Sequence, residues 1–532
     1  MNSRFRHKRP RMDGMRNAIA GLFCLSLLSA YPAVQSAANS DRVPQHVTER
    51  FAISLSAVEA LEALTSGRMT SEQYVDVLLQ RIANHPEINA FVHLDPDQAR
   101  ADAHLADEQR AVGQSLGPLH GLPILIKDSI NTAGMPTTAG TPALDGFRPA
   151  ENAAVVQTLL DAGAFVLGKT NLHELSAGYT TNNSFTGPTR NPYDSDRIAG
   201  GSSGGNGAAL AARFAPLALG EDTAGSVRVP AALTGTVGFR PTSGRYSQEG
   251  VVPLSSSLDT LGPMARTVQD VALADAIITG SPVGLEATSL KGLRIGVPRA
   301  HFRELLDPSV ERALNRLLER LERSGAILVE ADIPGVGELT LQVSGVLVLF
   351  EWPRDLGNYL ADQDTGLSVS DVASAVASPD VLAVLSLALS GVISEDDYLA
   401  VLHGQVPLLR QLYMAYLVDN ALDAVLYPTT PLPAPLIGEE IVTIDAVEVT
   451  VFDAYFRISH YAPVVGAPVL SLPLGQNPRG LPLGGIDIAG APGDDRRILA
   501  IGQAVSRVLP RIRPPGAIRP LPRSEGPGYP KD

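Results

Sequence analysis

Two glycine- and serine-rich turns hold the residue types in this chain that are best suited to chemistry. The first reads Ile198-Ala-Gly-Gly-Ser-Ser-Gly-Gly-Asn206, and the second reads Gly220-Glu-Asp-Thr-Ala-Gly-Ser-Val-Arg-Val-Pro-Ala231. Small residues let the main chain come close to a ligand, and successive N–H groups in such a turn can converge on an anion. The second turn therefore indicates an oxyanion-binding site with the Ser226 hydroxyl beside it.

Two other interpretations of these turns are flexible loops and a phosphate-binding cradle. Helix and strand patterns bracket both turns, which is unusual for a flexible linker. A phosphate-binding loop ends in Gly-Lys-Ser/Thr, and no lysine lies between Thr170 and Lys291. Taken alone, the two turns leave catalysis and a structural role open.

Lys127 is a second candidate, because it ends the apolar run Pro123-Ile-Leu-Ile126. Burying an ammonium group at the end of a strand is unfavourable unless the group is paired or loses its proton. A lysine with a lowered pKa is a usable general base. The alternatives are a salt bridge to Asp128 and a lysine whose charged end reaches solvent.

The elements that must position these residues follow an alternating pattern of strands and helices. Short apolar runs predict strands at 89–94, 123–126, 164–168, 293–297, 464–474 and 481–488. Helical spacing and end signals predict two helices within 56–82 and others at 97–112, 155–162, 205–213, 308–321 and 496–509. This order predicts an α/β fold, with a mixed, mostly parallel twisted sheet covered by helices on both faces of a single large domain.

The first 38 residues have the layout of a secretory signal peptide. A basic start is followed by an apolar stretch from Ala18 to Leu28 and by small residues at Ser36, Ala37 and Ala38. The apolar stretch is short for a membrane span, and a retained signal anchor is the alternative. We therefore expect an exported protein, periplasmic or secreted, with a linker over 39–54, a main domain over 55–510 and a disordered tail over 511–532.

Charge and cysteine content exclude several classes of function for the mature chain. Removal of residues 1–38 takes away six basic groups and Asp13, so the formal charge moves from −14 to −19. So acidic a chain is a poor binder of nucleic acid phosphates. The single cysteine, Cys24, lies in the predicted signal, which excludes disulfides, a thiolate nucleophile and cysteine-bound metal afterwards.

An ordered set of motifs covers nearly the whole predicted domain. It comprises Gly117-Pro-Leu-His-Gly-Leu-Pro-Ile-Leu-Ile-Lys-Asp128, Leu167-Gly-Lys-Thr-Asn-Leu-His-Glu174, Gly200-Gly-Ser-Ser-Gly-Gly205, Asp222-Thr-Ala-Gly-Ser-Val-Arg-Val-Pro-Ala231, Gly238-Phe-Arg-Pro-Thr242, Pro428-Thr-Thr-Pro431 and Gly466-Ala-Pro468. Together these motifs resemble the amidase signature family, whose members are serine amidases. The resemblance runs from about residue 55 to 510.

The resemblance implies a role for each residue that matches the family's motifs. The family's general base falls on Lys127, its bridging serine on Ser202, after a cis peptide bond from Gly201, and its nucleophile on Ser226. Its oxyanion donors fall on the main-chain N–H groups of Thr223, Ala224, Gly225 and Ser226, and its substrate-binding positions include Gly201 and Ser203. The family uses no metal and no cofactor.

These residues would form a proton relay. A serine hydroxyl is a poor nucleophile at neutral pH and needs an adjacent base. Neutral Lys127 would take a proton from Ser202 while Ser202 takes one from Ser226, which then attacks the amide carbon. The reverse transfer would protonate the leaving nitrogen, and water would then hydrolyse the acyl-enzyme.

Two residues depart from the family pattern beside the nucleophile. Ala224 replaces a glycine, and it would strain the turn if its φ were positive; otherwise it only narrows the pocket. Glu221 stands where the family usually has threonine, and we expect its carboxylate near the oxyanion, where it would lower activity or disfavour anionic substrates.

Three alternative functions are compatible with parts of this pattern. Gly200-Gly-Ser-Ser-Gly204 fits the nucleophile turn of α/β-hydrolases, which would require a histidine partner such as His120, His173 or His460. A glutamine-hydrolysing subunit of an aminoacyl-tRNA amidotransferase shares the same motifs, although the signal peptide and acidic charge argue against it. The third is an exported binding protein without turnover.

The expected substrate is a small amide with a neutral apolar or aromatic acyl group. His173-Glu174, Asn182-Asn183 and Arg190-Asn-Pro192 are similar to the branch of the family that acts on arylacetamides. Specificity is expected in the variable helical region 335–422, where Phe350, Trp352, Tyr359 and Tyr413 are possible pocket residues, with core packing as the alternative. We expect no stable membrane span after signal removal, and a homodimer is possible.

Overall fold

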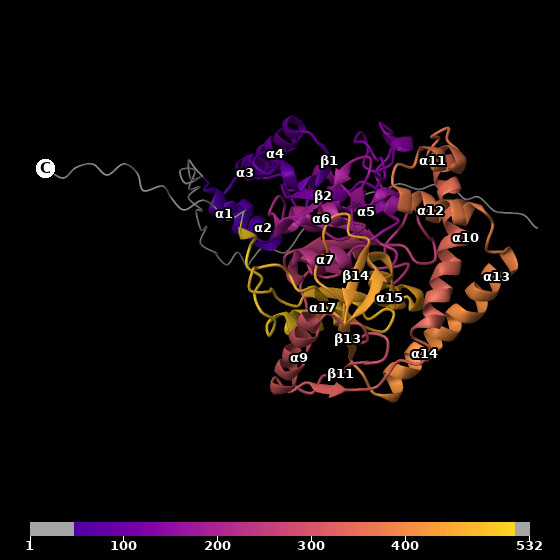
Figure 1. The fold of residues 1–532 in the computed structure, drawn as a ribbon. Helices are drawn as coiled ribbons and strands as arrows, with labels where there is room; N and C mark the ends of the chain where they lie inside the picture. The colour runs from indigo at the N-terminus through magenta and orange to yellow at the C-terminus, as the bar shows by residue number, and fades with distance from the viewer. Residues whose placement is uncertain (1–46, 517–532) are drawn as a thin grey trace, which may run out of the picture. The chain divides into compact units, whose positions relative to one another are not determined.

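An eleven-stranded sheet runs through the computed structural model, which describes residues 47–516 (Figure 1). The predicted signal peptide and residues 517–532 of the predicted tail lie outside the described residues. The strand order is β1-β3-β2-β8-β10-β9-β16-β17-β13-β11-β12. The bounds are β1 Phe91–Leu94, β2 Pro123–Lys127, β3 Phe165–Thr170, β8 Leu217–Asp222, β9 Val237–Arg240, β10 Thr260–Ala265, β11 Arg294–Gly296, β12 Ile327–Val329, β13 Ala424–Pro428, β16 Val469–Pro473 and β17 Gly485–Ala489.

The sheet is mixed, and its parallel pairs form two groups. Strand β2 pairs in parallel with β3 and β8, and β11 pairs in parallel with β12 and β13. The remaining six pairs of this sheet, within residues 47–516, are antiparallel. The predicted α/β class, the mixed sheet and the single large domain are therefore confirmed. The expected majority of parallel pairs is not found among the described strands, because four of the ten pairs are parallel.

Helices pack on the central strands in two groups. Helices α6 Gly204–Ala211 and α7 Arg228–Thr234 contact each other, and they cover β2, β8, β9 and β16. Helices α8 Val268–Thr279 and α17 Asp495–Ser506 also contact each other and cover β9, β10 and β16. Strands β2, β3 and β8 are buried along their whole length, as expected of parallel strands covered on both faces.

The N-terminal helices begin at well-formed caps. Helices α2 Ala57–Thr65 and α3 Ser71–Ala83 confirm the two helices predicted within 56–82, and both have complete capping boxes, at Ser56 and Thr70. One short helix differs from the prediction: α1 Glu49–Ser54 lies inside the segment expected to be a linker, and the Thr48 hydroxyl caps it.

The remaining elements connect these layers. They are α4 Pro96–Ala111, α5 Ala154–Asp161, α9 Pro308–Arg323, α15 Val451–Ser459, α16 Tyr461–Val465 and the ribbon strands β4 Asn182–Asn183, β5 Gly187–Pro188, β6 Arg190–Asn191, β7 Asp194–Ile198, β14 Ile441–Ile444 and β15 Val447–Thr450. The strand predicted over 464–474 starts later, because α16 occupies its first residues and ends at Gly466, whose φ is +73°.

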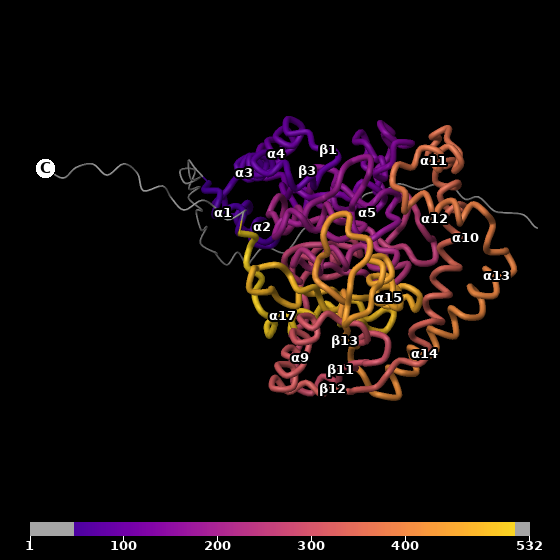
Figure 2. The backbone as a smooth tube through the Cα atoms, viewed as in Figure 1, coloured from indigo at the N-terminus to yellow at the C-terminus, as the bar shows by residue number. Residues whose placement is uncertain are grey.

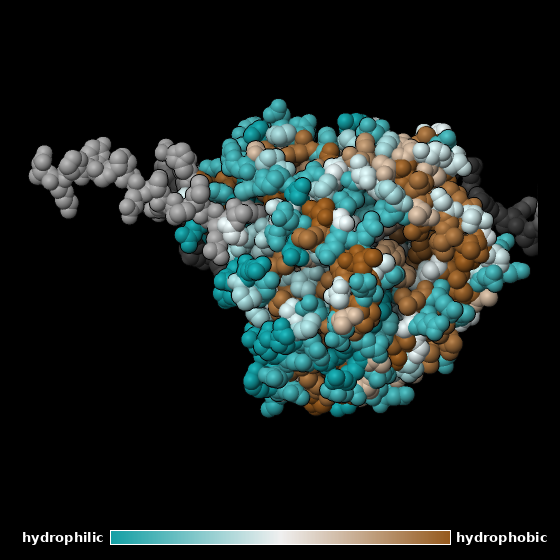
Figure 3. Space-filling model, viewed as in Figure 1, coloured by the Kyte–Doolittle hydropathy of each residue, from teal (hydrophilic) through white to brown (hydrophobic). Residues whose placement is uncertain are grey.

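The helical region predicted at 335–422 is present. Its helices are α10 Glu338–Asp362, α11 Val369–Ala375, α12 Pro379–Leu389, α13 Glu395–Ala400 and α14 Val406–Asp419, with a π-helical turn at Val401–Gln405. Figure 2 shows this orange stretch of chain packed together, and Figure 3 shows hydrophobic residues gathered over it. None of the helices within residues 47–516 has the length and apolar character that crossing a membrane requires.

The aromatic residues proposed for a pocket in this region are mostly internal. Trp352 is fully buried in a cluster with Leu356 and Leu385. Tyr413 is buried and donates its hydroxyl to the Gly490 carbonyl at 3.0 Å. For these two side chains, the structure favours the core-packing alternative.

Candidate active site

Lys127 lies at the end of β2 and is completely buried. Its Nζ donates to Ser202 Oγ at 2.7 Å and lies 3.1 Å from Glu221 Oε2. The proposed salt bridge to Asp128 is not formed, because Asp128 Oδ1 lies 3.5 Å from Lys169 Nζ instead. Burial lowers the pKa of Lys127, while the Glu221 carboxylate opposes this shift.

Ser202 lies between β7 and α6, and its peptide bond with Gly201 is cis. Its carbonyl accepts hydrogen bonds from the His173 N–H at 3.1 Å and from Thr181 Oγ1 at 3.2 Å. A Cβ added at Gly201 would stand 2.7 Å from the carbonyl carbon of Tyr179. Close contact with the 173–181 segment therefore requires glycine at Gly201 and fixes the position of Ser202.

The second turn lies directly against the first. The Ser203 N–H donates to the Ser226 carbonyl at 3.1 Å, and Ser203 Oγ donates to the Glu221 carbonyl at 3.3 Å. Ser226 is 5% exposed, whereas Ser202 and Ser203 have no exposed surface. Within residues 47–516, no hydrogen bond joins the hydroxyls of Ser202 and Ser226. The structure thus brings the two turns together through their main chains.

The turn that leads to Ser226 is shaped by Asp222 and Gly225. The Asp222 carboxylate accepts hydrogen bonds from the N–H groups of Gly225 at 2.8 Å and Val227 at 3.2 Å. The N–H of Gly225 is therefore occupied in this structure. The N–H groups of Thr223, Ala224 and Ser226 make no hydrogen bond to any described residue.

The departure at Ala224 causes no backbone strain. Ala224 is absent from the residues with positive φ, whereas Gly225 has a φ of +116°. A Cβ at Gly225 would stand 2.7 Å from Ser459 Cβ. The turn therefore needs glycine at Gly225 and tolerates alanine before it.

A buried network of charged residues supports this turn. The Arg228 guanidinium contacts Asp222 at 3.1 Å and Asp487 at 2.7 Å, and Arg240 contacts Asp222 at 3.1 Å. Burial raises the pKa of Asp222, but the two guanidinium groups outweigh it and lower that pKa well below its usual range. Asp222 is thus held as a carboxylate that can accept the turn's N–H groups.

The Glu221 carboxylate lies against the proposed base. Its Oε2 accepts hydrogen bonds from Lys127 Nζ, from Ser129 Oγ at 3.0 Å and from Ser176 Oγ at 2.9 Å. Sequence reasoning missed Ser129 and Ser176. Ser129 could have been noticed because it comes two residues after Lys127, whereas Ser176 gave no signal.

The three histidines considered as partners lie away from the two serine hydroxyls. The His120 ring contacts the Ala106 carbonyl, and the His173 ring lies between Asp380 and Thr180. Both ring nitrogens of His460 are buried without a partner among the described residues. None of these three rings contacts the hydroxyl of Ser202 or Ser226, which disfavours the α/β-hydrolase alternative.

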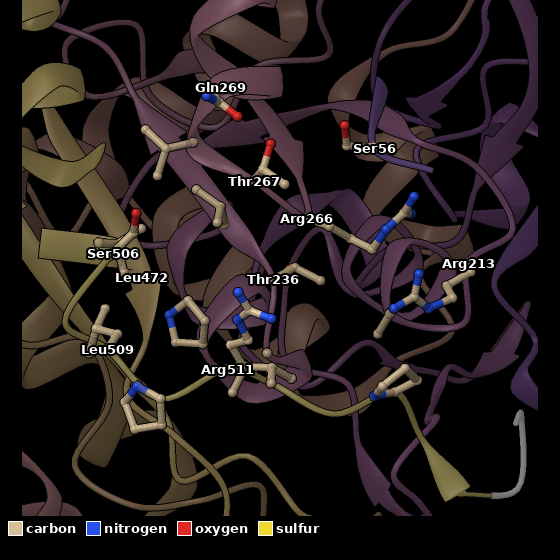
Figure 4. Close-up of a pocket in the computed structure, with 18 of the residues that line it drawn as sticks. Ser56, Arg213, Thr236, Arg266, Thr267, Gln269, Leu472, Ser506, Leu509 and Arg511 are labelled. Atoms are coloured by element: carbon tan, nitrogen blue, oxygen red, sulfur yellow. The ribbon is translucent and has the colours of Figure 1, made fainter. Parts of the chain in front are cut away.

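A cavity of about 480 Å³ lies elsewhere, and Figure 4 shows Arg213, Arg266 and Arg511 around it. Neither Lys127 nor Ser202 nor Ser226 lines this cavity. Arg213 donates to the Ile53 carbonyl at 2.7 Å, and Arg266 donates to the Ala215 carbonyl at 2.8 Å. These two arginines bind main-chain carbonyl groups, which is a structural role.

Comparison with known proteins gives matches over most of the chain. The family model described as Amidase matches residues 73–499. An indoleacetamide hydrolase from Allorhizobium ampelinum is 39% identical over 85% of this chain and 97% of its own length. A mandelamide hydrolase from Pseudomonas putida is 37% identical over 88% of this chain and 93% of its own length.

Two further matches bear on the fold and on one alternative function. A crystal structure of an amidase superimposes with a TM-score of 0.78 and 35% identity, over 86% of this chain and all of the other. A glutamyl-tRNA(Gln) amidotransferase component from Chloroflexus aggregans is 37% identical over 87% of this chain and 97% of its own length.

The charged network leads to a first prediction. Asp222→Asn leaves Arg228 and Arg240 without their shared counter-charge, so the free energy of unfolding should fall by about 3–5 kcal/mol. Turnover per folded molecule should also fall, because the Ser226 turn loses its anchor. Urea denaturation followed by fluorescence measures the first effect.

Asp194→Asn is the control for that prediction. Asp194 forms a half-exposed ion pair with Arg197, and the loss of such a pair should cost no more than about 1 kcal/mol. Equal losses of stability in the two variants would contradict the proposed importance of the buried network.

Proposed function

This chain belongs to the Amidase family and hydrolyses amide bonds, and we propose that it does so through an acyl-enzyme on Ser226. In this proposal Ser226 is the nucleophile, Ser202 is the bridging hydroxyl and Lys127 is the general base. The observation that carries the proposal is the 2.7 Å hydrogen bond between buried Lys127 Nζ and Ser202 Oγ.

The proton path follows from the order of these groups. Ser226 lies on the turn whose carbonyl accepts the Ser203 N–H at 3.1 Å, so the proposal requires its hydroxyl to reach Ser202 on the neighbouring turn. Neutral Lys127 takes the Ser202 proton as Ser202 takes the Ser226 proton, and the Ser226 oxygen then bonds to the amide carbon. Hydrogen bonds in such relays often tighten only when substrate is bound.

The free N–H groups of the second turn would hold the oxyanion. Thr223, Ala224 and Ser226 have N–H groups without an acceptor among the described residues, which supports this role. Collapse of the tetrahedral intermediate breaks the C–N bond, and the relay returns its proton to the departing nitrogen. Water then attacks the ester on Ser226 and releases the acid.

We propose a neutral substrate with an aromatic acyl group. Indoleacetamide and mandelamide, the compounds in the names of two relatives, are both small aryl amides, which supports this choice. The helical region 335–422 packs through largely apolar clusters and is hydrogen-bonded to the segments that follow β2 and β3, which supports a role in binding an apolar group. Glutamine hydrolysis within an amidotransferase is the second candidate, favoured by the similarity to the Chloroflexus aggregans protein.

We also propose that the enzyme is exported. The basic start, the short apolar stretch and the small residues at 36–38 support cleavage near Ala38. The proposed site has no cysteine and needs no redox partner, so it would work unchanged in an oxidising compartment.

The nucleophile can be tested by covalent labelling. A fluorophosphonate should label the wild-type protein and fail to label Ser226→Ala, and turnover should vanish in that variant, as expected for loss of the attacking group. Ser66→Ala, at an exposed position after α2, should behave as wild type. Labelling that survives in Ser226→Ala, at a site identified by peptide mass spectrometry, would assign the nucleophile elsewhere.

The substrate class can be tested with a panel of primary amides. Arylacetamides should give kcat/KM values at least ~10-fold above those of glutamine and of charged peptide amides, because an apolar pocket leaves a buried charge unpaired. Ammonia release measures all members of the panel alike. Glutamine as the best substrate would favour the amidotransferase candidate.

Export can be tested by expressing the full chain in a bacterial host. The N-terminus of the protein recovered outside the cytoplasm should begin near residue 39. Replacement of the apolar stretch 18–28 by polar residues should retain the protein inside the cell. A protein that keeps its first residues and stays in the cytoplasm would contradict the proposal.

A further inference from the structure

We propose that Glu221 is a positioning residue that holds Lys127 as an ion pair and thereby raises the pH at which this enzyme becomes active. This inference rests on the proposed role of Lys127 as the general base. It assigns a function to a position at which the family usually has threonine, a residue that cannot carry a negative charge.

The contacts of Glu221 indicate a carboxylate. Its Oε2 accepts three hydrogen bonds, from Lys127 Nζ at 3.1 Å, Ser129 Oγ at 3.0 Å and Ser176 Oγ at 2.9 Å. Glu221 and Lys127 are both completely buried. Three donors on one oxygen favour the ionised form of an acid, and a buried ammonium group needs such a partner.

The same contact positions the lysine. Nζ lies between Glu221 Oε2 at 3.1 Å and Ser202 Oγ at 2.7 Å. The hydroxyls of Ser129 and Ser176 fix the carboxylate from two other segments. Glu221 therefore keeps the amine within reach of Ser202 while it stabilises the charged form, which cannot accept a proton.

Two other acids face Lys127, and neither replaces Glu221. Asp222, the next residue on β8, forms ion pairs with Arg228 and Arg240. Asp259, just before β10, accepts hydrogen bonds from Thr223 Oγ1 and two main-chain N–H groups. Burial and the charge of Glu221 raise the pKa of Asp259 to about 8 and outweigh these hydrogen bonds, which lower it.

The sign of the effect follows from these charges. Burial alone lowers the pKa of Lys127 and favours the neutral amine that the relay requires. A neighbouring carboxylate stabilises the ammonium form and raises that pKa again. Activity should therefore rise with pH as Lys127 loses its proton, and the rise should occur at a higher pH than it would without Glu221.

The test is the pH dependence of kcat/KM for an uncharged aryl amide in wild type and Glu221→Gln. Glutamine keeps an oxygen acceptor and removes the charge. The acid limb, which is the part of the profile where kcat/KM rises with pH, should therefore move to lower pH by ~1–3 units, the range for an opposite charge at this distance. At pH values below the wild-type limb, kcat/KM of the variant should be at least ~10-fold higher than that of the wild type. The two enzymes should converge at alkaline pH.

A second measurement checks that the pH dependence reports the chemical step. A second variant checks that the effect does not come from misfolding. The rate of fluorophosphonate labelling of Ser226 should show the same displacement of the limb. Glu221→Thr restores the residue usual in the family and should shift the limb in the same direction. Asp275→Asn, which removes a buried carboxylate on α8 paired with Arg245, should leave the limb in place.

The outcomes separate this inference from the proposed function. An unmoved limb in folded Glu221→Gln, together with an inactive Lys127→Met, would overturn the role of Glu221 alone. Loss of activity at every pH in both folded Glu221 variants would also overturn it, because the carboxylate would then take part in the reaction. Full activity in Lys127→Met would refute the relay and this inference together.

Discussion

The proposed chemistry depends on one buried hydrogen bond, from Lys127 Nζ to Ser202 Oγ. An amine without contact to water is tolerable only if its surroundings offer acceptors or remove its charge. Here the strand end, the Ser202 turn and the Glu221 carboxylate meet at that nitrogen. The central sheet brings these groups together, because β2 and β8 are neighbouring strands and the turn after β7, which carries Ser202, packs against them.

Glu221 and Asp222, two buried acids at adjacent positions of β8, have separate roles. Successive side chains of a strand point to opposite faces, and Glu221 and Asp222 accordingly have different partners. Asp222 binds Arg228, Arg240 and the N–H groups of the Ser226 turn, so it fixes the shape of the oxyanion site. Glu221 binds Lys127 and two serine hydroxyls. One acid therefore shapes the nucleophile's turn, and the other is placed to control the base.

The helical region 335–422 is joined to this centre by hydrogen bonds as well as by apolar contacts. Tyr359 donates to Asn131 Oδ1 at 2.7 Å, and the main chain at Ala377 and Ser378 donates to the Glu174 carboxylate. Asn131 follows β2 and Glu174 follows β3, so the region most suited to select a substrate is tied to the loops that border Lys127. Changes of sequence in these helices can therefore reach the site.

The sequence by itself determined the fold class, the family and the residues of the proposed relay, because these depend on local signals. Apolar runs marked the buried strands, helical spacing of apolar residues marked α2 and α3, and glycine marked turns such as the one at Gly225, where no side chain fits. Helix α1 escaped notice because it is too short to show a period.

Only the tertiary structure decided which side chains surround Lys127. Ser176 and Glu221 come from separate segments, and no spacing in the chain relates them to the lysine. The sequence marked Glu221 only as a departure from the family pattern, and the fold shows that its side chain contacts the amine of Lys127. Gly225 was expected as an oxyanion donor from the family resemblance, whereas in the fold its N–H donates to Asp222.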